Sequence, residues 1–330
     1  MLVGSSPGRA DDGSTSLTPQ AIFPVQEFTQ THTPATAHAR SESIGWRLED
    51  IDFTPIDGTH SAADEPLLLL LIASSFIESG THLYASNLMS HFDGDQEIIT
   101  WLTEQWEAEE LQHGRALRTY VAHAWPSFDW EQAYAGFIEA FKPLCNMDKL
   151  EPRRGLEMVG RCVVETSTTS LYRAIQGHAR DPVLRDLVRR IGDDEVRHYK
   201  HFLRYFRKYQ QHEPCSRLAV FGALVRRSLE IGLRDTDSGL RHAYNGRYRD
   251  TTTPHPTFEE TRRAVHALLR PNVLVGLAGA MWLRPLQLAP RIEGALRKLF
   301  AGLARVLLFF SAPGTASPAA PAPKLRPPST

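Results

Sequence analysis

Apolar residues recur at positions i, i+3, i+4 and i+7 over long stretches in the middle of this chain, and good helix formers dominate there. This period is typical of amphipathic α-helices, whereas the strict alternation of a half-buried β-strand is scarce. The pattern predicts helices over residues 62–90, 95–124, 130–142, 152–178, 182–211 and 216–234. Four of these are long and their connections are short. We therefore expect an all-α fold, with a four-helix bundle within residues 60–235.

Proline and aspartate mark two of the predicted helix ends. Pro126 ends the helix over 95–124, because proline cannot continue the hydrogen-bond ladder of a helix. Asp181 precedes Pro182 at the start of the helix over 182–211. An Asp at this place accepts a hydrogen bond from a free backbone N–H, so Asp181 is predicted to cap that helix.

Both ends of the chain have a different composition. Residues 1–50 are rich in Ser, Thr, Pro, Gly and Ala without periodicity, and residues 313–330 are rich in Pro and Ala. We expect both segments to be disordered. Residues 255–312 contain further helical patterns, over 257–269, 272–283 and 291–310. These helices are expected to pack on the bundle or on a partner subunit. Because 291–310 mixes apolar residues with Arg and Lys, peripheral contact with a membrane surface is the alternative for that segment.

The charges of the chain nearly cancel, with 37 Lys and Arg against 38 Asp and Glu. This balance argues against a nucleic-acid binder driven by bulk positive charge. The three cysteines are far apart and form no Cys-x-x-Cys pair, which favours a reduced, cytoplasmic protein without a thiolate zinc site. No segment reaches the roughly 18 apolar residues of a membrane span, and the N-terminus has no signal-peptide core, so we expect a soluble protein.

One pair of residues occurs twice at the same spacing. Glu110 and His113 lie on the second predicted long helix, and Glu195 and His198 on the fourth. Residues three apart share a helix face, about 5–6 Å apart at Cβ, so each pair is able to bind one metal ion. Two cations of like charge require further carboxylates. Ferritin-like bundles take one more Glu from each of the two other helices.

Both of the other long helices offer such a Glu. Glu78 lies in the strongly apolar first helix, and Glu165 follows two valines in the third. An ionised Glu on an apolar helix face is costly unless it is paired or bound to a metal. Glu78 precedes Glu110 by 32 residues, and Glu165 precedes Glu195 by 30. The chain thus contains two copies of one layout, each an antiparallel helix pair.

These observations predict a di-metal centre in a ferritin-like bundle. Its six predicted ligands are Glu78, Glu110, His113, Glu165, Glu195 and His198. Carboxylates with imidazoles suit two iron ions, two manganese ions or a mixed pair better than zinc.

Each of these motifs also has a simpler interpretation. A single Glu-x-x-His is common on a solvated helix face, and residues 107–110 and 195–198 could each be charged surface. Four such coincidences in matching order are much rarer than one. Single histidines outside the layout are more often surface residues than ligands; these are His201, His212, His242 and His255. The pair at 226–227 is interpreted as a solvated basic face, with an acidic carrier protein as the alternative.

Three short stretches resemble a known family, the soluble acyl-carrier-protein desaturases. Residues 106–114 (WEAEELQHG) resemble their first metal motif, residues 194–198 (DEVRH) their Asp-Glu-x-x-His motif, and residues 165–168 (ETST) their Glu-x-x-Thr. The resemblance extends from about residue 65 to residue 210. It implies a ferritin-like fold with the same six ligands.

The resemblance also implies roles for other residues. Thr168 would lie near the oxygen-binding side and serve proton delivery, and Asp194 would orient a ligand histidine. Trp106, one turn before Glu110, is interpreted as core packing. The implied reaction is oxygen-dependent desaturation of a fatty acyl chain on acyl-carrier protein. An apolar tunnel beside the site would hold the chain, a ferredoxin-like donor would supply electrons, and the protein would form a homodimer.

Other functions share this metal layout. The alternatives are a hydroxylase or N-oxygenase of a small molecule, a rubrerythrin-like peroxide scavenger, and a ferritin-like iron-binding protein. Ferritin-type storage chains are usually shorter than this one. A helical scaffold without a metal is the alternative outside enzymes. The metal site indicates a class of chemistry and not a substrate.

Overall fold

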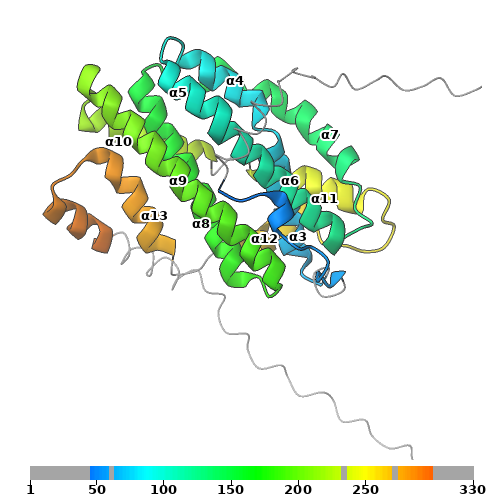
Figure 1. Ribbon diagram of the computed structural model, residues 1–330. Helices are drawn as coiled ribbons and strands as arrows, with labels where there is room; N and C mark the ends of the chain where they lie inside the picture. The colour runs from blue at the N-terminus through cyan, green and yellow to red at the C-terminus, as the bar shows by residue number, and fades with distance from the viewer. Residues whose placement is uncertain (1–44, 59–62, 232–235, 270–273, 300–330) are drawn as a thin grey trace, which may run out of the picture. The chain divides into compact units, whose positions relative to one another are not determined.

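The computed structural model describes residues 45–58, 63–231, 236–269 and 274–299, and the regular elements in these ranges are all helices (Figure 1). Four long helices form the bundle: α3 (Glu65–Ser79), α6 (Glu107–Ala124), α8 (Arg154–His178) and α9 (Pro182–His212). α3 packs along α6, and α8 packs along α9. The second pair is antiparallel, since Gly155 lies against Tyr209 and Gly192 against Tyr172. The prediction of an all-α four-helix bundle is confirmed.

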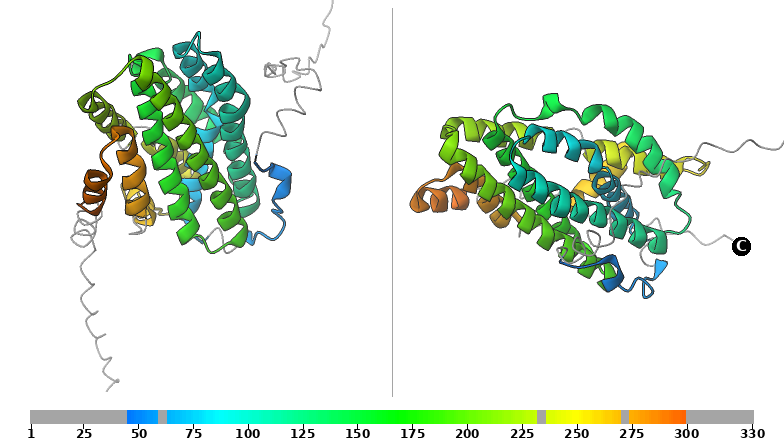
Figure 2. Two further views of the ribbon diagram at one scale, coloured as in Figure 1. Left: turned by 60° about the vertical axis from the view of Figure 1, so that its left-hand side comes forward. Right: turned by 45° about the horizontal axis from the view of Figure 1, so that its top comes forward.

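Shorter helices cover the bundle (Figure 2). They are α4 (His82–His91), α5 (Gln96–Trp101), α7 (Trp130–Phe141), α10 (Arg217–Glu230), α11 (Thr236–Tyr248), α12 (Phe258–Leu268) and α13 (Leu274–Leu283). α11 packs on α3 and α7, whereas α10 and α13 pack on α8. Residues 290–299 are also helical.

Two predicted helices are interrupted. The helix predicted over 62–90 is bent by 42° between α3 and α4, where Gly80 is the C-cap of α3. The helix predicted over 95–124 contains a π-helical segment, η2 (Leu102–Trp106), directly before α6. Such π-bulges often lie at functional sites, and this one ends one turn before Glu110.

The sequence pattern did not predict α11. The sequence of α11 is polar and contains two glycines, so its apolar period is weak. Those glycines permit close packing, because a Cβ at Gly246 would lie 2.9 Å from the Cβ of Ala133. Tertiary packing therefore outweighs helix propensity here.

The prediction that Asp181 caps α9 is confirmed, since its side chain accepts a hydrogen bond from the backbone N–H of Val183 at 2.8 Å.

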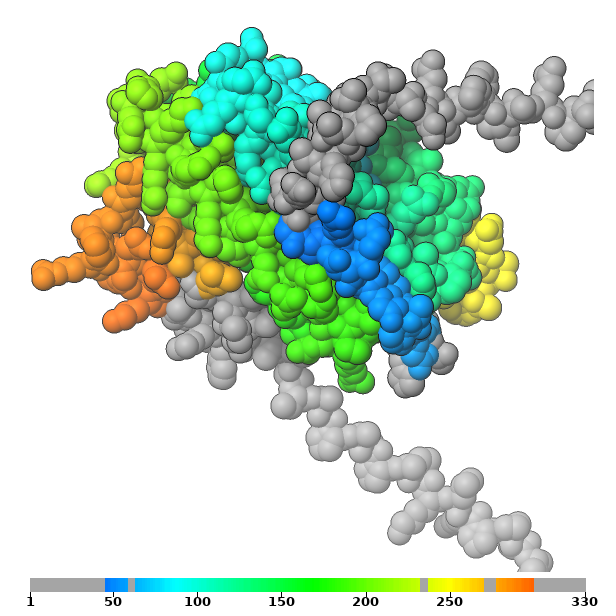
Figure 3. Space-filling model, viewed as in Figure 1, coloured from blue at the N-terminus to red at the C-terminus, as the bar shows by residue number. Residues whose placement is uncertain are grey.

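Residues 45–58 lie across the outside of the bundle, over α6 and α9 (Figure 3). Trp46 is buried, and its backbone oxygen accepts a hydrogen bond from Gln112 Nε2 at 2.9 Å. The predicted disordered segment therefore extends too far at 45–50, because Trp46 has apolar and polar partners on the bundle. Residues 1–44, the predicted tail over 313–330 and the second half of the predicted helix over 291–310 lie outside the described residues.

Two apolar clusters divide the interior along the bundle. One contains Phe76, Leu117, Tyr172 and Ile191 with their neighbours, and the other contains Trp106, Val163 and Phe202 with theirs. On each long helix the predicted ligands lie between the two clusters, whereas the buried Glu157 and Arg161 of α8 lie within the second cluster. The ligands thus form a polar layer with an apolar cluster on either side.

No single helix in the described ranges is long and apolar enough to cross a bilayer, although the bent pair of α3 and α4 passes on length and composition. α3 is almost wholly buried inside the bundle.

A glycine sets the distance between α3 and α6 at the polar layer. A Cβ at Gly114 would lie 2.5 Å from Ser79 Oγ and 2.7 Å from the backbone nitrogen of Ser79. Gly114 follows His113, and Ser79 follows Glu78. The close approach of the two backbones therefore depends on the missing side chain.

We expect Gly114→Ala to lower the melting temperature by about 5 °C, because the added methyl group forces the two helices apart. The matched control is Gly177→Ala near the end of α8, where a Cβ meets nothing within 4 Å. The control should leave the melting temperature unchanged or raise it slightly, since Ala favours helix. Equal melting temperatures for both variants would contradict the role of Gly114.

Candidate metal centre

All six predicted ligands lie together in the polar layer. Two groups of donor atoms form, and within each group the atoms lie within 4.8 Å of one another. The first group is Glu78, Glu110, His113 and Glu195, and the second is Glu110, Glu165, Glu195 and His198. Every one of these residues is at most 5% exposed. Because Glu110 and Glu195 belong to both groups, the arrangement is that of two adjacent cation sites with shared carboxylates.

The two histidines point the same ring atom at the centre. His113 Nε2 lies 3.0 Å from Asp194 Oδ2, and His113 Nδ1 lies 3.2 Å from Glu195 Oε1. On the other side, His198 Nε2 lies 2.7 Å from Glu109 Oε2, and its Nδ1 lies 3.0 Å from Glu110 Oε1. A neutral imidazole that donates through Nε2 keeps a lone pair on Nδ1. Both lone pairs then face the carboxylates of the centre.

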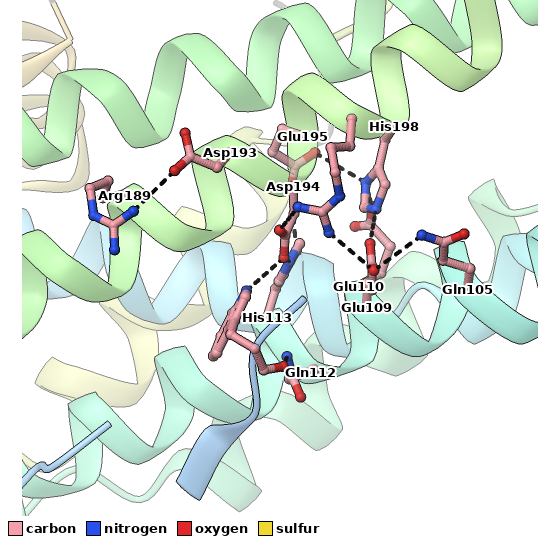
Figure 4. A network of polar contacts seen from close by, with 12 residues as sticks. Gln105, Glu109, Glu110, Gln112, His113, Arg189, Asp193, Asp194, Glu195 and His198 are labelled. Atoms are coloured by element: carbon pink, nitrogen blue, oxygen red, sulfur yellow. Dashed lines mark hydrogen bonds and ion pairs between the residues drawn. The ribbon is translucent and has the colours of Figure 1, made fainter. Parts of the chain in front are cut away.

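The residues that orient the histidines cross between helices. Asp194 on α9 holds His113 of α6, and Glu109 on α6 holds His198 of α9 (Figure 4). Arg197 donates to both of these acids, through one nitrogen to Asp194 and through the other to Glu109 Oε1 at 3.1 Å. The predicted position of Asp194 beside a histidine agrees with this geometry. The sequence interpretation missed Glu109, although both motifs carry an acid directly before the shared Glu.

Trp46 adds a contact from outside the four helices. Its Nε1 donates to Asp194 Oδ2 at 2.7 Å, and its ring stacks on that of His113 at 6.2 Å between centroids. Nothing in the sequence pattern indicated this contact, because Trp46 belongs to a segment without periodicity.

Several buried atoms of the centre have no hydrogen-bond partner. They are His113 Nδ1, His198 Nδ1, Glu165 Oε2 and Glu195 Oε1. Buried polar atoms are rarely left unpaired, since each unpaired atom costs about 1–3 kcal/mol. Cations between the two groups would accept all four lone pairs. The cluster of four carboxylates and two imidazoles is therefore able to bind two metal ions, and this donor set suits iron and manganese.

The pKa shifts of the metal-free cluster agree with a site that binds cations. Burial raises the pKa of Glu165 to about 8, and burial together with Glu110 and Glu195 raises the pKa of Glu78 well above its usual range. Burial opposes a charge on His113, yet Asp194 and Glu195 raise its pKa. Without cations, the cluster therefore retains protons to balance its charge.

Two hydroxyl groups contact the carboxylates. Thr168 Oγ1 donates to Glu195 Oε2 at 2.9 Å, so the predicted residue reaches the centre through this carboxylate. Tyr172 donates a hydrogen bond to Glu78 Oε1. The sequence interpretation missed Tyr172, although it lies two turns beyond Glu165 on the same face of α8.

The other residues that the sequence singled out lie elsewhere. Trp106 is buried beside Tyr84 and Phe202, as expected for core packing. The metal-binding groups found among the described residues contain none of His201, His212, His242 and His255. The predicted basic face at 226–227 is wrong for Arg227, which is largely buried and pairs with Glu157 at 3.1 Å. Arg226 pairs with Glu151 on the surface.

A hollow of about 480 Å³ lies between the start of α3 and α12, lined by Glu65, Pro66, Leu69, Pro256, Glu260, Thr261 and Ala264. None of these residues belongs to the centre. The apolar tunnel beside Glu78 and Glu165 stays a prediction.

We expect Asp194→Asn to weaken Mn²⁺ binding by about 10- to 100-fold, because an amide no longer holds His113 in the required tautomer. Equilibrium dialysis of the purified protein measures this change. The matched control is Asp193→Asn, whose side chain is 48% exposed and pairs with Arg173 and Arg189 outside the centre. Equal loss of affinity in both variants would exclude a specific role for Asp194.

Metal binding should strengthen as the pH rises towards 8. The pKa of Glu165 is raised to about 8, so this group holds a proton at lower pH in the metal-free protein. An incoming cation displaces that proton. The affinity for Mn²⁺ should therefore fall about tenfold per pH unit below 8 for each proton displaced. Calorimetric titrations between pH 6 and 8 would refute this expectation if the affinity did not change.

No protein-family model matches the chain, and no curated protein matches its sequence. Two solved structures of R2-like ligand-binding oxidase mutants are similar, one with an anaerobically and one with an aerobically reconstituted Mn/Fe cofactor. They share 12% and 13% identity with this chain, cover 78% of it and 98% of their own chains, and have a TM-score of 0.43. By its four long helices and its paired Glu and Glu-x-x-His residues, the chain has the helix and ligand arrangement that is typical of ferritin-like di-metal carboxylate proteins.

Proposed function

We propose that the protein is an oxygen-dependent di-metal oxidoreductase that acts on an unactivated C–H bond of an organic substrate. The observation that carries the proposal is the pair of overlapping donor groups, which share Glu110 and Glu195 and leave unpartnered atoms facing one another. Two reducible ions at this place would supply the activation of dioxygen. Iron, or a manganese and iron pair, is the expected cofactor.

The side chains around the centre would prepare it for this chemistry. Asp194 and Glu109 keep the two Nδ1 lone pairs available by accepting from Nε2 of each histidine. The apolar clusters on both sides of the polar layer exclude bulk water, which strengthens every electrostatic interaction within it. Thr168 is the nearest hydroxyl to Glu195 on α8 and is suited to hold or transfer a proton there.

The desaturase-like motifs favour a fatty acyl chain on a carrier protein, with electrons from a ferredoxin-like donor. Desaturation would remove two hydrogens from adjacent carbons. A small-molecule substrate is the second candidate, and Arg161, a buried arginine one turn before Glu165 on α8, favours it.

Oxygen uptake tests the reaction class. Protein loaded with Fe²⁺ should consume dioxygen in the presence of a chemical reductant, and Glu165→Ala should reduce the rate at least tenfold because one group loses a carboxylate. The control is Glu139→Ala on the exposed face of α7. Uptake that ends after one oxidation of the bound iron, with every candidate substrate present, would contradict an oxidase and favour iron storage.

Mass spectrometry of cells that express the protein tests the substrate. New double bonds in the lipids of cells with the wild type, and none with Glu165→Ala, would support desaturation. Unchanged lipids together with another altered metabolite would refute desaturation and leave the reaction class intact.

A further inference from the structure

A buried arginine with free N–H groups lies one turn from the metal centre. Arg161 is on α8, four residues before Glu165, and is only 7% exposed. Its Nε donates to Glu157 Oε1 at 2.8 Å. No described residue accepts a hydrogen bond from its two terminal nitrogens, and the ring of Tyr84 lies 6.0 Å from Cζ. Neither nitrogen is among the fully buried atoms without a partner, so both are accessible to solvent. Water or a bound anion is therefore able to occupy this end of the side chain.

The single negative charge of Glu157 does not neutralise both Arg161 and Arg227. This carboxylate is fully buried and also accepts from Arg227 at 3.1 Å and from the backbone N–H of Glu151 at 2.9 Å. Arg227 reaches it by crossing Gly160, where a Cβ would lie 3.0 Å from Arg227 Nε. Two guanidinium groups therefore share one buried carboxylate. A further acid beside Arg227, Glu230, is 52% exposed.

The guanidinium of Arg161 lies near Tyr84 of α4. The ring of Tyr84 lies 6.0 Å from that of Trp106, which is one turn before Glu110. Glu165 shares a face of α8 with Arg161, at about 5–6 Å between their Cβ atoms. A molecule bound to Arg161 would therefore lie about one helix turn from Glu165, the nearest predicted ligand on α8.

We propose that Arg161 binds the carboxylate of the substrate. The inference rests on the proposed function and names its substrate class, which is a short organic acid oxidised a few bonds from its carboxylate. A guanidinium recognises a carboxylate by charge-assisted hydrogen bonds from its terminal nitrogens. An acyl thioester carries no negative charge at that place, so a free acid fits Arg161 better than a chain bound to a carrier protein.

Calorimetry with a charged ligand and its neutral analogue tests this site. The full chain loaded with Mn²⁺ should bind hexanoate at least tenfold more tightly than hexan-1-ol. Arg161→Gln should weaken hexanoate binding by about 10- to 100-fold and leave hexan-1-ol unchanged. The control is Arg226→Gln, because Arg226 is 55% exposed and pairs with Glu151 on the surface. Equal affinity for hexanoate in wild type and Arg161→Gln, which direct coordination to the metal would give, overturns the proposal.

A second measurement needs no variant and covers the case in which Arg161→Gln does not fold. Crystals of the wild type soaked in sodium bromide should show an anomalous peak at the terminal nitrogens of Arg161, and a site without bromide overturns the proposal. The Mn²⁺ content is measured on the same preparations. A wild type that holds no Mn²⁺ refutes the di-metal function, whereas the bromide soak still decides whether Arg161 binds an anion.

Discussion

Four carboxyl groups that meet inside a protein repel one another and lose their hydration. Bound protons or bound cations lower the free-energy cost of this arrangement, and the rest of the structure positions the carboxylates for one or the other. Glu78, Glu110, Glu165 and Glu195 meet in one layer between two apolar clusters. With cations absent, burial raises the pKa of Glu165 to about 8, so a proton on this group offsets part of the charge at neutral pH. With cations present, the same oxygens and the two Nδ1 atoms would become ligands.

The two halves of the centre stabilise each other across the bundle. Each histidine receives its orienting acid from the opposite helix, and Arg197 joins both acids. A shift of α6 against α9 would therefore disturb both histidines at once. α6 also contacts α3, and Gly114 sets the distance between these two helices beside His113 and Glu78. Precise placement of ligands thus depends on backbone contacts as much as on the ligands themselves.

The sequence predicted what depends on periodicity and repetition. The long helices were found by their apolar period, and the six clustered residues by the repeated Glu and Glu-x-x-His, because a motif that recurs on helices of a bundle has few ways to be arranged. Glu109 repeats in the same way as Asp194 and could have been found by comparing the two copies. The sequence could not have predicted the positions of Trp46, Tyr172 and α11, because these depend on tertiary contacts that leave no period in the sequence. Arg227 was misread because its neighbour is at the surface, and only the packing against Gly160 turns it inward.

The central claim is that Glu110 and Glu195 are shared between two metal ions. Anomalous diffraction from crystals of the full chain grown with Mn²⁺ tests it most directly. The account predicts two peaks per chain, about 3.5–4 Å apart, with both carboxylates between them and one histidine Nδ1 on each ion. A single peak, or ions bound away from these residues, would contradict it.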